Sequence, residues 1–151
     1  MRNVLKYSCN VPEVKLLSIM GIDKSVDFLG KIGIHVDGDK AGLSMALGTV
    51  EVSTVQMAAG YAMIANGVYI TPTFYTKVVD KNGNTIIEPN QEKTRVMTEQ
   101  NAYVEISLLH GALEAGGTAS TYSRTLGNMD VAGKTGTTTD KSSFRFSSFW
   151  L

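Results

Sequence analysis

The sequence has little cysteine, little histidine and no net charge. Cys9 is the only cysteine among 151 residues, so no disulfide can form within the chain and a cysteine-based metal site lacks partners. Lysine and arginine together number 14, and so do aspartate and glutamate. Because a chain without net charge exerts little attraction on polyanions, we do not expect nucleic acid as a partner.

Long apolar runs are also missing. No stretch approaches the roughly 20 apolar residues that span a bilayer, and residues 1–10 lack the apolar core of a signal peptide. We therefore expect no membrane span and no leader in this sequence. Hydrophobic residues make up 43% of the chain and charged residues 19%, which is typical of a folded globular domain rather than a disordered tail.

Four segments carry the start and stop signals of helices. These signals predict helices from Asn10 to Gly21, from Asp23 to Gly33, from Ser53 to Gly67 and from Thr98 to about residue 115. Asn10 is the expected N-cap of the first helix, and the first two helices are expected to form a hairpin. The glycines and charges of residues 35–50 predict an irregular connection.

Strand signals occur in two places. The segments YITPTFYTKVVD and TIIE flank Asn82-Gly83, which predicts a β-hairpin, and MDVAGKTGTTT predicts a further strand with a glycine-rich middle. Helices are predicted before, between and after these strands, but strands and helices do not alternate regularly. This order indicates an α+β fold, in which a helical subdomain accompanies part of an antiparallel sheet.

The tetrapeptide Lys134-Thr135-Gly136-Thr137 is the first candidate site. A lysine beside a glycine on a strand lets a ligand backbone approach closely, and two threonine hydroxyls can bind a carboxylate that the ammonium attracts. The segment is therefore a candidate acceptor for an acidic substrate terminus. The alternative is an ordinary exposed strand, since short motifs often match by chance.

The triplet Ser8-Cys9-Asn10, at the start of a predicted helix, is the second candidate. Its hydroxyl and amide could relay a proton and hold a substrate carbonyl, or they could simply cap the helix. The two histidines, His35 and His110, show no ligand spacing, so we expect no metal site.

Several longer segments accompany these two motifs. They are VPEVKLL after Asn10, LSMALGTVEVSTVQMAAGYAMIANGVYITPTFYTKVVDKNGN, GGTA at 116–119 and DVAGKTGTTTD. In this order they resemble the transpeptidase domain of bifunctional (class A) penicillin-binding proteins over residues 1–140. The motifs of that superfamily are Ser-x-x-K, Ser-x-Asn and K-T-G, and two of the three are present. The resemblance implies one β-lactamase/transpeptidase-like domain, truncated at both ends, with a divergent C-terminus at 141–151 and an extracytoplasmic, membrane-anchored parent protein.

The resemblance also implies a reaction and a role for each site residue. In this family a serine attacks the D-Ala-D-Ala end of a peptidoglycan stem peptide, an amine resolves the acyl-enzyme, and β-lactams mimic the substrate; no cofactor is implied. By resemblance, Ser8 would assist proton transfer to the leaving amine, Asn10 would bind the acyl-side amide, and Lys134 would tune the proton network and attract the terminal carboxylate. Thr135 and Thr137 would bind that carboxylate, the Thr137 N–H would form half the oxyanion hole, and Gly136 would keep the strand open to the ligand.

The sequence departs from the family pattern at two points. No serine stands three positions before any lysine, so Ser-x-x-K is absent and we predict that this chain alone is inactive. An upstream part of the domain is thus an expected partner. The C-terminal FRFSSFWL is either the vestige of an aromatic strand or the product of a frame disruption, and the K-T-G strand is expected to lack part of its sheet. The alternatives are an inactive peptide-binding or interaction module, a remnant without function, and a chain with no stable fold.

Overall fold

The computed structural model describes residues 1–127, 129–137 and 144–150; the side chains of 124, 137 and 144–150 are outside that description. Its helices are α1 (Arg2–Tyr7), α2 (Asn10–Met20), α3 (Ile22–Lys31), the 3₁₀ helix η1 (Leu43–Leu47), α4 (Thr54–Ile64), α5 (Glu99–His110) and α6 (Ser120–Leu126). Its strands are β1 (Val68–Ile70), β2 (Val78–Val79), β3 (Thr85–Ile87), β4 (Lys93–Arg95), β5 (Val131–Thr137) and β6 (Phe144–Trp150). The predicted α+β fold class is confirmed.

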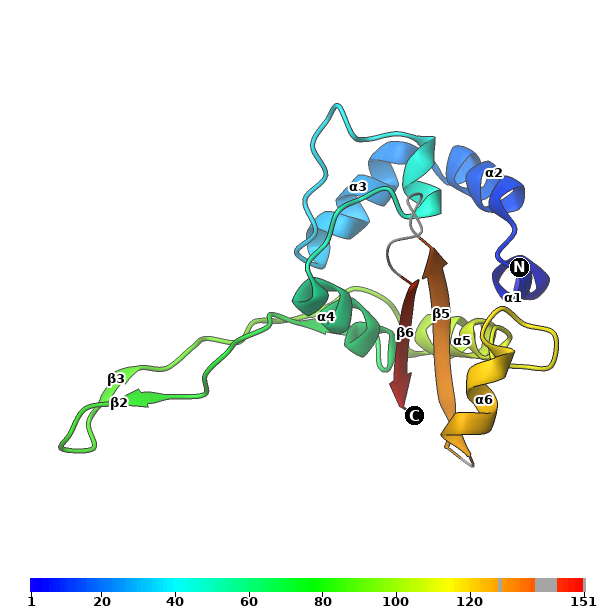
Figure 1. Ribbon diagram of the computed structural model, residues 1–151. Coiled ribbons are helices and arrows are strands. Elements are labelled where there is room, and N and C mark those ends of the chain that lie inside the picture. Colours follow the sequence, from blue (N-terminus) through cyan, green and yellow to red (C-terminus); the bar gives the residue numbers. More distant parts are fainter. Residues whose placement is uncertain (128, 138–143, 151) are drawn as a thin grey trace.

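The elements form a body with one long projection (Figure 1). Helices α2 and α3 and the 3₁₀ helix η1 make up one part of the body, and η1 packs on α2. Helices α4 and α5 make up another part, where α5 packs against β5 and α4 against β6. Helix α1 contacts both α2 and α5, so it connects the two groups of helices near the N-terminus.

Most predicted helix boundaries are confirmed. The Ser53 hydroxyl accepts a hydrogen bond from the Gln56 N–H at 3.2 Å, and Gln56 accepts one from the Ser53 N–H at 2.9 Å, so the predicted capping box exists. Thr98 caps α5 by accepting from the Asn101 N–H at 3.2 Å. Gly33 and Gly67 have φ of 72° and 78°, the left-handed geometry expected after a helix.

Three predicted boundaries are wrong. Helix α3 begins at Ile22, with Gly21 as its N-cap, rather than at Asp23. Cys9 rather than Asn10 is the N-cap of α2, because Cys9 has the extended backbone that precedes a helix and Asn10 is the first helical residue. Helix α5 ends at His110 rather than near residue 115. Beyond it, the N–H groups of Ala112 and Leu113 bond three residues back, which closes tight turns instead of a further α-helical turn.

Among the described residues, most of the buried hydrophobic side chains form three small clusters. The first lies among α3, α4 and β1 and contains Ile32, Ile34, Met63 and Tyr69. The other two adjoin β5 and contain Ala112, Leu113, Ala119 and Val131 in one case, and Leu109 and Ala132 in the other. Ile64 packs against both the first cluster and the Leu109 and Ala132 cluster, so α4 links the helices to the β5 strand.

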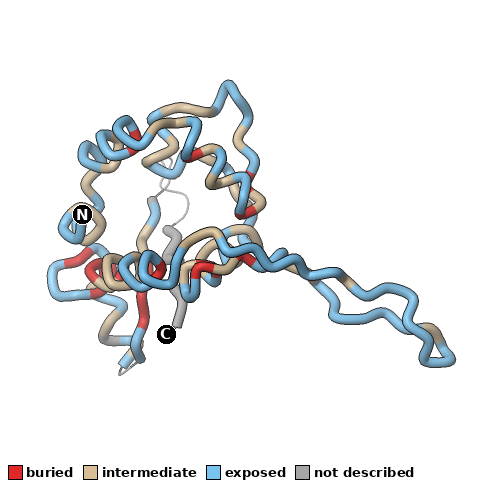
Figure 2. Tube along the Cα trace, turned by 180° about the vertical axis from the view of Figure 1, so that it is seen from behind, coloured by how far each residue is buried: buried red, intermediate tan, exposed pale blue. Residues whose placement is uncertain are grey.

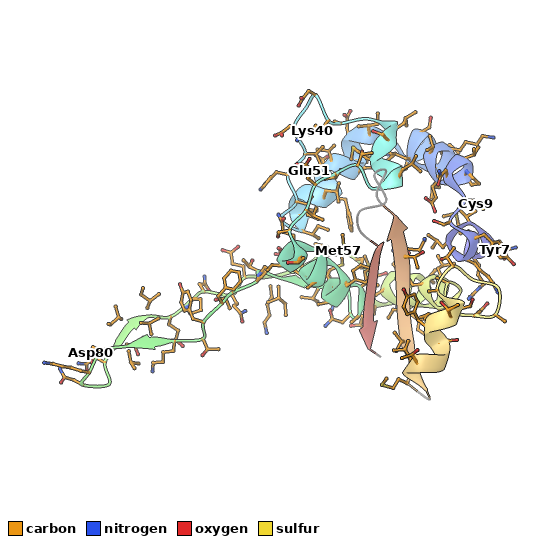
Figure 3. All side chains as sticks on the ribbon, viewed as in Figure 1. Tyr7, Cys9, Lys40, Glu51, Met57 and Asp80 are labelled. Carbon is orange, nitrogen blue, oxygen red and sulfur yellow. The ribbon has the colours of Figure 1, made fainter. Side chains whose placement is uncertain are left out.

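The projection is an arm formed by residues 71–92, which carries the β2–β3 hairpin. The hairpin predicted around Asn82-Gly83 is confirmed, and Gly83 has the positive φ of 87° that its turn requires. Strand β1, expected to run into this hairpin, instead pairs with β4 at the base of the arm. Almost the whole arm is exposed (Figure 2), and Asp80 lies at its tip (Figure 3).

Strand β6 pairs with β5 in antiparallel register over their full lengths, with Lys134 opposite Ser147. The backbone of FRFSSFW therefore lies where a neighbouring strand of the K-T-G segment is expected. Among the described residues, β5 and β6 make a sheet of two strands. Within those same residues, no helix combines the length and the apolar character needed to cross a bilayer.

Candidate functional site

Ser8 lies in the tight bend between α1 and α2. Its φ of 53° and ψ of 55° are left-handed, and it is the only non-glycine residue with positive φ among those described. The Ser8 N–H bonds the Leu5 carbonyl at 3.3 Å, and the Cys9 N–H bonds the Val4 carbonyl at 2.9 Å. An L-residue in this region costs about 1–2 kcal/mol, so the surrounding contacts must hold the bend in place.

Contacts of α1 with α5 and with the turn that follows α5 provide that support. The Arg2 guanidinium donates to the Ser107 carbonyl at 2.7 Å and to the Ser107 hydroxyl at 2.8 Å. The Lys6 ammonium pairs with Glu114 at 3.1 Å. Because both contacts lie on the α5 side of α1, they fix the helix whose C-terminal end presents Ser8.

Lys134 and Ser8 meet directly. The Lys134 ammonium donates to the Ser8 hydroxyl at 2.8 Å and to the Thr135 carbonyl at 3.1 Å. Burial falls along β5 from the fully buried Ala132 to the exposed Gly136, so Lys134 lies where the strand leaves the core. The two motifs identified from the sequence therefore form one site with a hydroxyl, a cation and an accessible strand.

Glu13 adds a carboxylate to this site. It is half-buried in the first turn of α2, three positions after Asn10, and interacts electrostatically with Lys134. Burial raises the pKa of Glu13, and the Lys134 charge partly opposes that rise. Burial likewise lowers the pKa of Lys134, and Glu13 partly restores it. The site thus holds two opposite charges that are both partly removed from water.

Thr135 is held from the other side by Thr118, which lies in the loop between α5 and α6. The two hydroxyls are hydrogen-bonded at 3.0 Å. The Thr118 N–H donates to the Lys6 carbonyl at 3.1 Å, so the same residue also contacts α1. The α1 bend and the β5 strand are consequently joined twice, once through Lys134 and once through Thr118.

The remaining predicted site residues are less completely placed. Asn10 starts α2 two positions after Ser8 and is exposed. Gly136 is exposed on β5. Thr137 is the last residue of β5, but its side chain lies outside the described part of the chain. The structure brings Ser8, Lys134 and Thr135 together directly.

Sequence reasoning did not identify Thr118 or Glu13 as members of the site. The GGTA segment supports the family resemblance but does not by itself indicate a site residue. Glu13 has the position of an ordinary first-turn acidic residue. Neither position carries a local signal, because both contacts depend on how distant elements pack.

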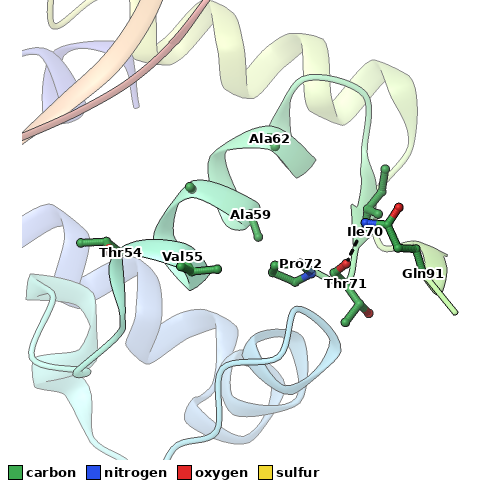
Figure 4. Close-up of a pocket in the computed structure, with 9 residues that line it drawn as sticks. Thr54, Val55, Ala59, Ala62, Ile70, Thr71, Pro72 and Gln91 are labelled. Atoms are coloured by element: carbon green, nitrogen blue, oxygen red, sulfur yellow. Dashed lines mark hydrogen bonds between the residues drawn. The ribbon is translucent and has the colours of Figure 1, made fainter. Parts of the chain in front are cut away.

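Chemically, the arrangement can attract an anion to Lys134, offer hydroxyl groups to it and pass a proton through Ser8. Within the described residues, no three His, Cys, Asp or Glu side chains lie together in a way that could hold a metal ion. A separate hollow of about 420 Å³ lies between α4 and the base of the arm (Figure 4). Its lining is mostly apolar side chains, including Val55, Ala59 and Ile70, and contains none of the candidate site residues.

Known proteins match both the sequence and the fold. A family model described as the penicillin-binding protein transpeptidase domain matches residues 1–143. Penicillin-binding protein 1A of Clostridium acetobutylicum is 37% identical over 150 residues, which cover 97% of this chain and 18% of that protein. Penicillin-binding protein 1F of Bacillus subtilis is 33% identical over 142 residues, covering 91% of this chain and 19% of that protein. The chain thus spans about a fifth of the length of these relatives.

Solved structures agree in fold. The crystal structure of penicillin-binding protein 1A from Haemophilus influenzae matches with a TM-score of 0.77 at 22% identity, over 98% of this chain and 28% of that chain. Penicillin-binding protein 3 from Mycobacterium tuberculosis, complexed with aztreonam, matches with a TM-score of 0.77 at 22% identity, over 100% of this chain and 42% of that chain. The transpeptidase-like fold implied by the sequence resemblance is confirmed.

Proposed function

Because this chain belongs to the penicillin-binding protein transpeptidase family, we propose that its residues form two walls of the cleft in which a D,D-transpeptidase binds a peptidoglycan stem peptide. The observation that carries this proposal is the 2.8 Å hydrogen bond from Lys134 to Ser8. It joins a hydroxyl and a cation from opposite ends of the chain at the point where β5 becomes accessible.

Each residue has a role in this proposal. Lys134 attracts the terminal carboxylate of the D-Ala-D-Ala end, and the hydroxyls of Thr135 and Thr137 bind it. Ser8 passes a proton toward the leaving amine, since its hydroxyl can accept from Lys134 and donate to a substrate nitrogen. Asn10 binds the amide on the acyl side. Gly136 lets the ligand backbone approach the strand, and the Thr137 N–H supplies one half of the oxyanion hole.

None of these residues is proposed to be the attacking serine. Lysine-activated acyl transfer needs a serine and a lysine on one helical face, and the sequence has no Ser-x-x-K. We propose that a separate segment supplies the nucleophile and that the chain by itself binds without reacting. β-Lactams are the expected mimics of the substrate, in line with the aztreonam complex of the similar M. tuberculosis protein.

The binding part of the proposal is tested with a D-Ala-D-Ala peptide and its C-terminal amide, measured by NMR titration of the 151-residue chain. We expect weak, saturable binding that favours the acid. Lys134→Ala should reduce acid binding by roughly tenfold or more, since hydrogen bonds to charged groups contribute about 1.5–3 kcal/mol. Lys77→Ala, at an exposed lysine of the arm, is the matched control and should change nothing. Equal affinity for acid and amide contradicts the proposal.

The catalytic part is tested by labelling with a fluorescent penicillin. The chain alone should form no covalent adduct, whereas a mixture with the Ser-x-x-K segment of a relative should be labelled if the two parts dock. Labelling of the chain alone that disappears in Ser8→Ala would identify Ser8, activated by Lys134, as the nucleophile and would overturn this assignment of roles. Binding without labelling in either case favours an inactive peptide-binding module.

A further inference from the structure

We propose that Thr118 is a positioning residue, which directs the Thr135 hydroxyl toward the substrate carboxylate and joins the Ser8 wall of the cleft to the Lys134 wall. This inference rests on the proposed function of the cleft. It assigns a role to a residue outside both sequence motifs. Its basis is the pair of hydrogen bonds that Thr118 makes and the rigidity of the loop that carries it.

The loop around Thr118 is fixed by its two neighbours. Gly117 is buried, its N–H bonds the Glu114 carbonyl at 2.8 Å, and a Cβ at this position would overlap the Ala112 carbonyl. On the other side, Ala119 is completely buried and its N–H bonds the Ala112 carbonyl at 2.8 Å. Thr118 therefore stands between two anchored residues, and its position is determined by packing rather than by its own exposed side chain.

From this fixed position Thr118 contacts both walls. Its N–H donates to the Lys6 carbonyl at 3.1 Å, two positions before Ser8. Its hydroxyl accepts a hydrogen bond from the Thr135 hydroxyl at 3.0 Å. Lys6 is itself paired with Glu114 at 3.1 Å, so the end of α1, the loop and β5 are held in one network.

The hydroxyl pair also has a direction that a ligand can select. Each threonine hydroxyl has one hydrogen and can accept as well as donate. In the structure Thr135 donates to Thr118. A bound carboxylate favours the reverse arrangement, in which Thr118 donates to Thr135 and the single Thr135 hydrogen points at the carboxylate. Hydrogen bonds arranged in such a chain strengthen one another, so Thr118 improves Thr135 as a donor. Without the Thr118 hydroxyl, the Thr135 hydroxyl rotates freely, and only the ligand can orient it.

The test compares the acid and amide forms of the D-Ala-D-Ala peptide on the 151-residue chain by NMR titration. Replacing the hydroxyl with a methyl group in Thr118→Val should lower the ratio of acid to amide affinity by about 2- to 10-fold, the range for one neutral hydrogen bond. Thr118→Ser retains the hydroxyl and should restore the ratio. Thr125→Val, at an exposed threonine of α6, is the matched control and should leave it unchanged. Thr118→Ala replaces Thr118→Val if the valine variant loses the dispersed spectrum of the folded chain.

The outcomes separate this inference from the proposed function. If Lys134→Ala removes the acid preference but both Thr118→Val and Thr118→Ala keep it, Thr118 has no positioning role. If the Thr118 variants weaken acid and amide binding equally, the residue is only structural and the inference is again wrong. If Lys134→Ala also keeps the preference, the proposed function fails, and the inference fails with it.

Discussion

The Lys134 ammonium donates a 2.8 Å hydrogen bond to the hydroxyl of Ser8, which lies 126 positions earlier in the chain. The two groups come from elements of very different character. Lys134 projects from a strand whose first half is buried, whereas Ser8 ends a six-residue helix in a left-handed bend. The geometry of the site therefore depends on a backbone conformation that serine adopts at a cost.

That cost predicts an unusual order of stability at position 8. Both Ser8→Ala and Ser8→Gly remove the hydroxyl, but only glycine relieves the positive φ. We expect Ser8→Gly to be more stable than Ser8→Ala by about 1 kcal/mol, as measured by urea unfolding.

Position 18 provides the control, because Ser18 is exposed inside α2. There the order should reverse, with alanine more stable than glycine by about 0.5–1 kcal/mol. Alanine more stable than glycine at both positions would show that Ser8 does not hold the left-handed conformation.

The pair of opposite charges in the candidate site, Glu13 and Lys134, predicts how the pKa of Lys134 can be changed. Burial lowers this pKa, and the Glu13 carboxylate partly restores it. Glu13→Gln keeps the shape of the side chain and removes its charge, so the pKa of Lys134 should fall further. The measurement is an NMR titration of the carbon next to the Lys134 ammonium. Glu88→Gln, at an exposed carboxylate of the arm, should leave the titration unchanged.

The lowered pKa of Lys134 also predicts how stability depends on pH. Between its folded value and the ordinary lysine value of about 10.4, the folded chain holds fewer protons at Lys134 than the unfolded chain does. The Lys134 contribution to stability therefore rises with pH through that window. Lys134→Met should remove this rise from the curve of unfolding free energy against pH. If the slope of unfolding free energy against pH is unchanged in Lys134→Met, Lys134 has the same pKa in the folded and unfolded chain.

Sequence reasoning succeeded where the signal was local. The caps at Ser53 and Thr98 and the turn at Asn82-Gly83 each determine their structure within a few residues, and all three are confirmed. Helices α1 and α6 were not predicted, because both are short and their N-cap positions hold Met1 and Ala119, which are not typical capping residues. The β1–β4 pair was not predicted either, since its strands are short and lie about twenty residues apart in the sequence.

The candidate site shows the same difference between local signals and contacts of distant segments. Ser8 and Lys134 were identified as candidates from their local motifs and given roles by the family resemblance, but only the folded chain shows that they touch. Thr118 and Glu13 were missed, because their roles come from loop packing and from the position of α2 relative to β5. Contacts of this kind depend on tertiary structure that no short pattern encodes.

The rigidity of the Thr118 loop is testable at Gly117. An alanine Cβ at this position would overlap the Ala112 carbonyl, a backbone atom that cannot rotate away. We expect Gly117→Ala to destabilise the chain by about 1–3 kcal/mol in thermal or urea unfolding. Gly30→Ala, on an exposed part of α3 with open space around it, should be neutral or stabilising by up to about 1 kcal/mol. Equal effects of the two variants would show that the loop has room to adjust.

The tip of the arm should respond to pH independently of the body. One Asp80 oxygen accepts the N–H groups of Asn82 and Asn84, both at 2.8 Å, and the other accepts from the Asn84 side chain at 2.9 Å. These bonds lower the pKa of Asp80, so its contribution is present at neutral pH and is lost as the pH falls through the lowered value. The two amide protons should therefore shift together at a pH below the usual aspartate range. Asp80→Ala should abolish that shift and speed amide exchange in β2 and β3. The midpoint of global unfolding should be the same as that of the control variant Asp39→Ala, because the arm contributes no residue to the buried clusters. A lowered global midpoint in Asp80→Ala alone would show that the arm folds as one unit with the body.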